Sequence, residues 1–170
     1  MNQCQAVGIL VTGLMTKNTT KMNKDIKEIE NRLNDIIQKN EDAIKGYEKA
    51  ADNTKEAGLK MYFNNKARER RTFLVELKAA TPALETRDKI DGSTAGALHR
   101  TWMDVKAFFS GDDAEAMLEE AIRGDKAAIE EYNEILADTH VPPSVASIIR
   151  AQRDSLKQDL AQNRTLEDLR

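Results

Sequence analysis

Four long amphipathic segments, joined by two short turns and one long connection, constrain the fold of this chain more than any other feature. Apolar residues recur at three- and four-residue steps over about residues 24–53, 56–81, 112–138 and 143–168, which is the period of a helix with one buried face. The turns within the first and last pairs are so short that each pair must be antiparallel, whereas residues 82–111 are long enough to cross a bundle end to end. The sequence therefore predicts an all-α fold: a ferritin-like antiparallel four-helix bundle with a long crossover.

The composition fits one helical domain and argues against two classes of partner or chemistry. Of the 170 residues, 40% are hydrophobic and 32% are charged, and only three are proline. The net charge is -3, with Lys and Arg interspersed among Asp and Glu, so we expect no nucleic-acid partner. Cys4 is the single cysteine, which excludes an intramolecular disulfide and favours a reducing cytoplasm.

Residues 1–21 differ from the rest of the chain. The segment Ala6–Met15 is apolar, but it has no basic residue before it and is too short to span a bilayer, so we expect neither a secretory signal nor a membrane partner. The charge-dense sequence opens at Met22. We therefore expect residues 1–21 to be an N-terminal extension, poorly ordered or the product of a misassigned start, and residues 22–170 to form the bundle.

Each predicted helix has a polar residue in the middle of its apolar face. Asn40 interrupts the first stripe, which includes Ile26 and Ile29, and Arg70 interrupts the second. An antiparallel turn near Thr54 brings Asn40 level with Arg70. A partly buried Arg needs a carboxylate partner.

The second helix pair repeats this arrangement. Asp125 lies within the third stripe, and Gln152 and Ser155 lie near the fourth. A turn near His140 places Asp125 beside both of them. The sequence thus predicts a polar layer at mid-height, formed by Asn40, Arg70, Asp125, Gln152 and Ser155.

The long connection has signals for one short helix. Pro82 ends the second helix, and Asp91-Gly92 forms a turn. Ser93 or Thr94 then caps a helix that runs to Phe109 and whose apolar face covers an edge of the bundle. We interpret Trp102 on that face as a packing residue.

A di-iron centre in such a bundle needs one Glu from each of two helices and a Glu-x-x-His from each of the others. The chain has two histidines, His99 in the connection and His140 in the last turn, and neither is at mid-height on a bundle stripe. A guanidinium at Arg70 would also repel cations. We therefore expect no ferroxidase site, no catalytic residue and no cofactor.

Four acidic residues near the polar layer leave a weaker metal site open, namely Glu41, Glu48, Glu69 and Asp125. In the simpler interpretation, the three glutamates face water or pair with Arg70 and nearby lysines, and no metal binds. For Asp125 the two interpretations are balanced, because an acid within an apolar stripe needs a partner or a proton.

The chain resembles a bacterial family of uncharacterised ferritin-like four-helix-bundle proteins, classed as a domain of unknown function. The resemblance covers about residues 24–169 and is carried by 45–51, 96–106, 124–128 with Tyr132, and 164–169. It implies the fold, a bacterial cytoplasmic setting and a stress-related role. The family carries Glu at the position of Ile122, and Glu and His near Ser155 and Leu160, so these differences weaken an inherited metal site.

Two functions follow as hypotheses. The first is a non-catalytic bundle that acts by self-association, as a homo-oligomer, or by binding another protein. The alternative is a redox bundle that binds iron or manganese through a degenerate carboxylate site.

Overall fold

The computed structural model describes residues 4–82 and 114–169, with side chains from residue 21 onward except those of residues 166 and 167. Within these ranges every regular element is a helix: α1 (Cys4–Asn53), α2 (Ala57–Ala80), α5 (Ala114–Leu136), α6 (Pro143–Gln162) and a short 3-10 helix, η1 (Leu166–Leu169). The described part of the chain contains no strand. The predicted all-α helical fold is confirmed.

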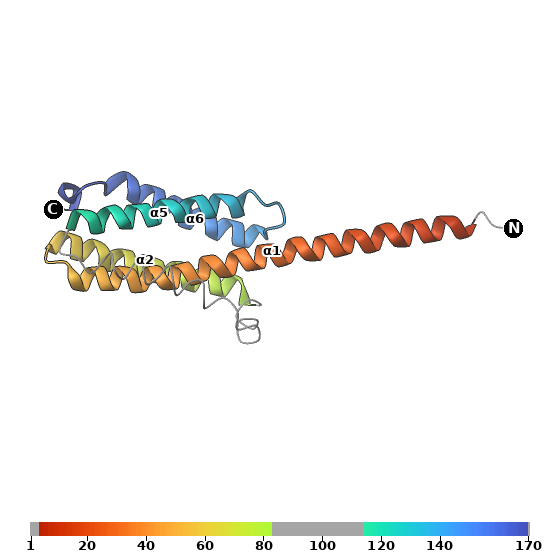
Figure 1. Cartoon of the computed structure of the whole chain (residues 1–170), viewed down its shortest axis with the longest axis horizontal. Coiled ribbons are helices and arrows are strands. Elements are labelled where there is room, and N and C mark those ends of the chain that lie inside the picture. The colour runs from red at the N-terminus through yellow and green to blue at the C-terminus, as the bar shows by residue number, and fades with distance from the viewer. Residues whose placement is uncertain (1–3, 83–113, 170) are drawn as a thin grey trace.

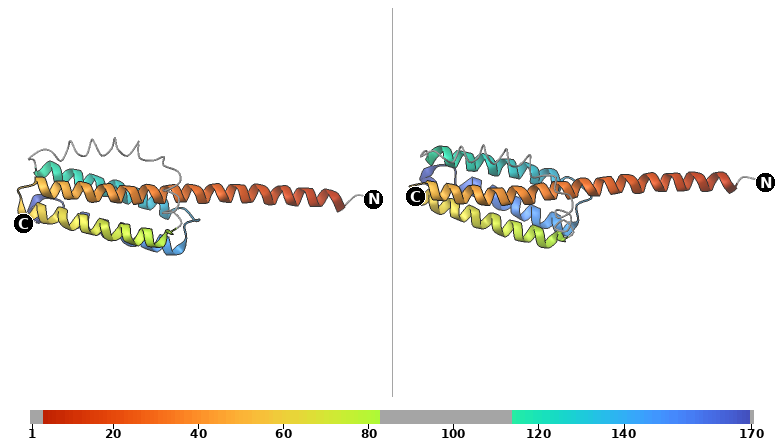
Figure 2. Two further views of the ribbon diagram at one scale, coloured as in Figure 1. Left: turned by 90° about the horizontal axis from the view of Figure 1, so that it is seen from below. Right: turned by 60° about the horizontal axis from the view of Figure 1, so that its bottom comes forward.

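The four α-helices pack side by side as a bundle (Figure 1). Contacts join α1 to α2, α5 to α6, α2 to α6 and α1 to α5, so α2 and α5 lie diagonally opposite each other. Neighbouring helices are antiparallel, whereas α2 and α5 run in the same direction (Figures 1 and 2). The predicted crossover helix, with His99 and Trp102, lies outside the described residues, and the ferritin-like character of the bundle stays a prediction.

The end of α6 differs from the sequence prediction. This helix begins at Pro143, as expected from the proline pair, but it ends at Gln162 rather than near residue 168. The carboxylate of Asp168 accepts hydrogen bonds from the backbone N–H groups of Arg164 and Thr165, both at 2.9 Å. This local capping starts a new turn at η1 and replaces a continued α-helix.

The beginning of α1 also differs. The helix begins at Cys4, and its first part runs well beyond the other helices (Figure 1). Ile26, which we predicted in the buried stripe, is 43% exposed because the bundle core begins only at Ile29. The division into an extension of residues 1–21 and a bundle stays a prediction. No helix in the described ranges is both long and apolar enough to cross a membrane.

The bundle has two apolar clusters, one on each side of its middle. The first lies toward the end where α1 leaves the bundle, and it includes Leu33, Ile36, Leu77, Ile135, Val145 and Ile149. The second lies toward the η1 end and includes Ala50, Leu59, Phe63, Met117, Leu118 and Ala121. The residues between these clusters are polar and buried, and they form the candidate site.

Two helical glycines provide a matched test of how η1 is attached to the bundle. A Cβ atom added at Gly58 in α2 would lie 2.1 Å from the backbone oxygen of Leu169, whereas one added at Gly124 in α5 would meet nothing within 4 Å. We expect Gly58→Ala to displace η1, seen as faster hydrogen exchange at residues 166–169. The control Gly124→Ala should raise the free energy of unfolding by about 0.5–1 kcal/mol, because Ala is the better helix former. Unchanged exchange in Gly58→Ala would show that η1 does not pack as described.

Candidate functional site

Asp125 lies at the centre of the bundle and is fully buried, with 0% of its surface exposed. Two cations from α2 contact its carboxylate: Arg70 Nη2 donates a hydrogen bond to Oδ1 at 2.5 Å, and Lys66 Nζ lies 2.6 Å from Oδ2. The hydroxyl of Tyr47, from α1, donates to Oδ1 at 2.7 Å. Three helices therefore converge on one carboxylate.

The helical repeat explains how two cations reach the same acid. Lys66 and Arg70 are four residues apart on α2, so they lie one above the other on the face that points into the bundle. Because α5 is diagonally opposite, their long side chains cross the interior to reach Asp125. Lys66 is only 2% exposed and Arg70 only 3% exposed, so water does not solvate these charges.

Lys66 is surrounded by acidic groups from three helices. Its ammonium lies 3.1 Å from Glu69 Oε2 of α2 and 3.1 Å from Asp159 Oδ2 of α6, in addition to Asp125 of α5. Tyr62 donates a hydrogen bond to the same Asp159 oxygen at 3.2 Å. One ammonium group thus holds three carboxylates together.

A chain of hydrogen bonds continues from Arg70 to the other helices. Arg70 Nη1 donates to Asn40 Oδ1 at 3.2 Å, and Asn40 Nδ2 donates to the Tyr132 hydroxyl at 3.3 Å. Tyr132 donates in turn to Gln152 Oε1 at 3.2 Å, and Gln152 Nε2 donates to the backbone oxygen of Phe73 at 3.1 Å. We call these hydrogen bonds, together with the contacts of Asp125 and Lys66 described above, the central polar network. It joins all four α-helices.

The structure places the five residues of the predicted polar layer as follows. Asn40 and Arg70 are in direct contact, and Asn40, Arg70, Asp125 and Gln152 are all buried. Asp125 is paired with α2 and α1 instead of with Gln152 and Ser155, because the α2 cations reach across to it. Ser155 is only partly buried and donates to Glu69 Oε1 at 2.6 Å.

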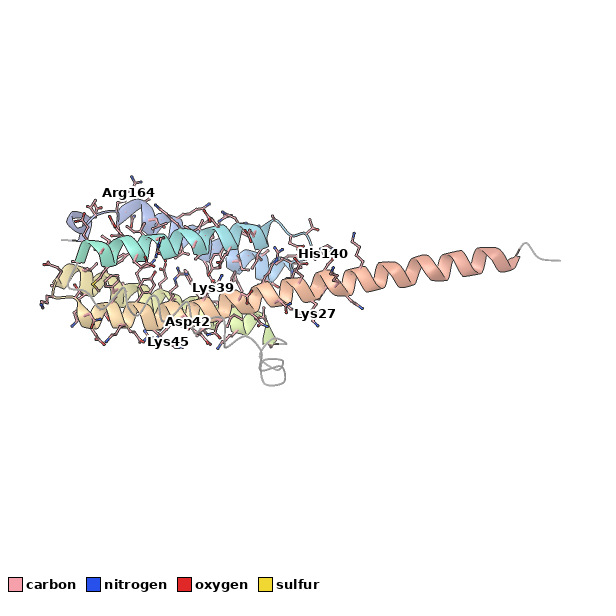
Figure 3. All side chains as sticks on the ribbon, in the orientation of Figure 1. Lys27, Lys39, Asp42, Lys45, His140 and Arg164 are labelled. Atoms are coloured by element: carbon pink, nitrogen blue, oxygen red, sulfur yellow. The ribbon has the colours of Figure 1, made fainter. Side chains whose placement is uncertain are left out.

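The four candidate metal ligands all have cationic partners. Glu41 accepts from Lys78 at 2.7 Å, Glu48 is paired with Arg71, and Glu69 and Asp125 contact Lys66. Among the described residues, no group of three or more potential ligands is arranged to hold a metal ion. His140 is exposed in the turn at the end where α1 leaves the bundle (Figure 3), with Nδ1 3.0 Å from Asp138 Oδ1.

Sequence reasoning missed Lys66, Asp159 and the roles of the tyrosines. Lys66 lies between Phe63 and Arg70 at helical steps of three and four residues, so its position on the inward face was readable. Asp159 lies at the edge of the apolar stripe of α6, and at such a position the helical spacing does not indicate an inward-facing side chain. The helical period indicates no polar role for the three tyrosines, yet each hydroxyl belongs to the polar interior.

The charges of the cluster are mutually stabilised. Burial alone raises the pKa of Asp125, but Arg70 and Lys66 outweigh burial and hold that pKa below its ordinary value. Burial lowers the pKa of Lys66, but the attraction of Asp125 and the other carboxylates brings the net shift upward. All three groups are therefore charged at neutral pH.

The pKa values of the three tyrosines are raised, whereas the pKa of Asp125 is lowered. Burial raises the pKa of Tyr47 well above its ordinary value, and the adjacent Asp125 carboxylate raises it further. Burial is also the largest cause of the raised pKa of Tyr62 and of Tyr132. The three hydroxyls therefore remain protonated hydrogen-bond donors.

The sequence of this chain matches the model of a known protein family. A family model described as a domain of unknown function, DUF2383, matches residues 28–138, more than half of the chain. The chain belongs to this family. No curated protein and no solved structure matches it. The DUF2383 match includes Asn40, Lys66, Arg70 and Asp125, whereas the α6 members of the central polar network lie beyond it.

Removing the charge of Asp125 tests whether the cluster controls stability. We expect Asp125→Asn to lower the free energy of unfolding by about 3–5 kcal/mol, because two buried cations lose their main partner. The control Glu48→Gln breaks an exposed pair with Arg71 and should cost about 0–1 kcal/mol. Urea unfolding at neutral pH measures both.

The difference in free energy of unfolding between wild type and Asp125→Asn depends on pH. Because the folded-state pKa of Asp125 is lowered, its contribution is present above the unfolded pKa of about 3.9 and is lost as the pH falls through the folded value. The difference between wild type and Asp125→Asn should therefore shrink below about pH 4. An Asp125→Asn variant as stable as wild type at pH 7 would contradict the central role of the cluster.

Alkaline titration tests the burial of the tyrosines. The chain has three tyrosines, Tyr47, Tyr62 and Tyr132, all with raised folded-state pKa values, so no exposed tyrosine masks the signal. Stability from these groups is fully present below the unfolded pKa of about 10 and falls as the pH rises above it. We expect phenolate absorbance near 295 nm to appear only together with the loss of helical circular dichroism. Phenolate formation near pH 10 in a folded chain would contradict the structure.

Proposed function

We propose that this DUF2383 chain is a non-catalytic, ferritin-like helical bundle that acts by associating with itself or with another protein. The observation that carries the proposal is that the charged groups of its interior neutralise one another. Lys66 and Arg70 bind Asp125 at 2.6 and 2.5 Å, and each of these three residues is at most 3% exposed.

Catalysis and ligand binding need groups whose charges or lone pairs can be redirected to a substrate. Here a reacting molecule would have to break a buried ion pair, which costs several kcal/mol when a charge is left without a partner. The tyrosine hydroxyls are likewise engaged within the fold. The interior is thus suited to holding four helices together, and the activity of the protein is assigned to its surface.

A second candidate is an iron- or manganese-binding redox bundle. The observation that favours it is the convergence of Glu69, Asp125 and Asp159 from three helices on one cationic position, the Lys66 ammonium. Carboxylate oxygens are ligands that such metals accept. A metal ion at this position would have to displace Lys66, which is why this candidate ranks second.

The cellular setting belongs to the proposal and is supported by the resemblance described above. Under this proposal the bundle works in the bacterial cytoplasm as part of a stress response. The single cysteine, Cys4, agrees with a reducing compartment.

Metal loading decides between the two candidates. The purified whole chain is incubated anaerobically with Fe²⁺ or Mn²⁺, desalted and analysed for metal, and oxidase activity is then measured on exposure to oxygen. We expect less than one metal ion per ten chains, because every candidate carboxylate is already paired with a cation, and we expect no oxidase activity.

Variants identify the site if metal does bind. Stoichiometric metal that is lost in Asp125→Asn but kept in the surface control Glu48→Gln would overturn the first candidate in favour of the second. Stoichiometric metal with no change in either variant would point to a different site and would equally remove the support that the paired interior gives to a non-catalytic role.

A further inference from the structure

The first part of α1 extends past the rest of the bundle. Residues 21–28 have no buried side chain, and the first buried residue among the described side chains of α1 is Ile29, at 5% exposure. Figures 1 and 2 show this part of α1 running beyond the ends of α5 and α6 from every side, and Figure 3 places Lys27 near the point where it leaves the bundle. We call residues 4–28 the α1 arm.

The apolar stripe of the bundle continues onto the arm. Met22 and Ile26 stand at the same three- and four-residue spacing as the core residues Ile29 and Leu33, yet they are 51% and 43% exposed. In the sequence the spacing runs on through Met15 and Val11. Five of the six charged residues of the arm fall at other helical positions: Lys17, Lys21, Lys24, Lys27 and Glu28. Asp25, three residues after Met22 and four before Ile29, shares the stripe and is partly buried. The stripe that builds the core therefore continues onto the arm with one charged residue, Asp25, and its described apolar members, Met22 and Ile26, are uncovered in the single chain.

The arm is also a poor helix by local preference. Residues 7–20 include two glycines, two β-branched valines and four threonines, all of which favour helix less than Ala or Leu. Helices of such sequence draw their stability from packing of an amphipathic face rather than from propensity. An arm that is helical from Cys4 onward thus calls for a partner along its stripe.

We propose that the α1 arm packs antiparallel against the α1 arm of a second copy of this chain, which makes the protein a symmetric dimer. The inference rests on the proposed function and names the partner for its self-association. A two-fold axis between residues 16 and 17 brings Met22 level with Val11 and Ile26 level with Val7 of the other copy. It also brings Ile29, where the core begins, level with Cys4, where the helix begins. The two arms thereby match over their full length, which is roughly 37 Å at 1.5 Å per residue.

One argument favours a second copy as the occupant, and another favours the antiparallel direction. The two-fold contact is self-complementary, so the same stripe covers itself with no further surface. The antiparallel direction places the lysines of one arm, at 17, 21, 24 and 27, beside the half of the other arm that has no charged residue, 4–16, apart from the pair of Lys17 residues near the axis. A parallel pair would instead align all four lysines with their own copies, which is unfavourable.

The mass of the whole chain in solution tests this proposal, with intact mass spectrometry confirming that residues 1–21 are present. Light scattering after size exclusion should give twice the chain mass of 19.1 kDa. The variant Met22→Lys/Ile26→Lys should give 19.1 kDa, and its bundle should stay folded by circular dichroism, because both side chains are exposed in the single chain. The matched control is Met61→Lys/Val75→Lys, which alters two α2 residues that are 63% and 68% exposed, and it should remain a dimer.

Each other outcome overturns a defined part of the proposal. A dimer that persists in Met22→Lys/Ile26→Lys keeps self-association and rejects the arm as its surface. A wild-type chain that is monomeric at all concentrations rejects self-association altogether and leaves the proposed function only binding to another protein. A monomer that floats with phosphatidylglycerol vesicles, and no longer does so as Met22→Lys/Ile26→Lys, rejects the second copy in favour of a lipid surface.

Cys4 reports the direction of pairing. In the antiparallel dimer the two Cys4 residues lie at opposite ends of the paired arms, far beyond the Cα separation of about 4.4–6.8 Å that a disulfide needs. Mild oxidation should therefore leave the dimer without a covalent link on a non-reducing gel. A disulfide-linked dimer in high yield would overturn the antiparallel arrangement.

Discussion

The ion cluster of Asp125 with Arg70 and Lys66 is the interaction on which the arrangement of the bundle depends. It joins diagonally opposite helices through the interior, at 2.5 and 2.6 Å, whereas most other contacts join neighbours. Burying three charges costs solvation energy that the ion pairs largely return, so the cluster need not add net stability. Its effect is on which structure forms, because any structure that buries these residues without joining them leaves a charge unpaired.

The same interaction fixes the register of the helices. Sliding α2 by one turn relative to α5 would move Arg70 by about 5.4 Å and break its contact with Asp125. The central polar network adds the same requirement for α1 through Asn40 and for α6 through Gln152. The two apolar clusters on either side tolerate several ways of packing, since hydrophobic contact is not directional. The polar middle therefore supplies the specificity that the apolar ends lack.

Sequence patterns predicted the helices well and their partners less well. The apolar period gave the bundle helices to within a few residues at most boundaries, and the short turns gave the contact between Asn40 and Arg70. Periodicity places a residue on a face but does not say how far a long side chain reaches. For this reason the pairing of Asp125 with α2, instead of with the neighbouring α6, was not predicted, and neither was the role of Lys66. The end of α6 was missed because Asp168 caps a local turn within a stretch that still has helical spacing.

The ion-paired interior of the bundle and the exposed α1 arm are related in two ways: the first leaves function to the surface, and it also fixes the position of the helix that carries the second. A bundle whose buried charges are all engaged offers little to a ligand inside, so selection for a function would act on what the bundle presents outside. The described side chains with large exposed apolar groups are few, and two of the four, Met22 and Ile26, lie on the α1 arm. They continue the stripe that the core uses, and the central network holds the rest of α1 in one register through Asn40 and Tyr47. The ion cluster thus sets the position of the helix whose far end carries the surface best suited to meet a second copy.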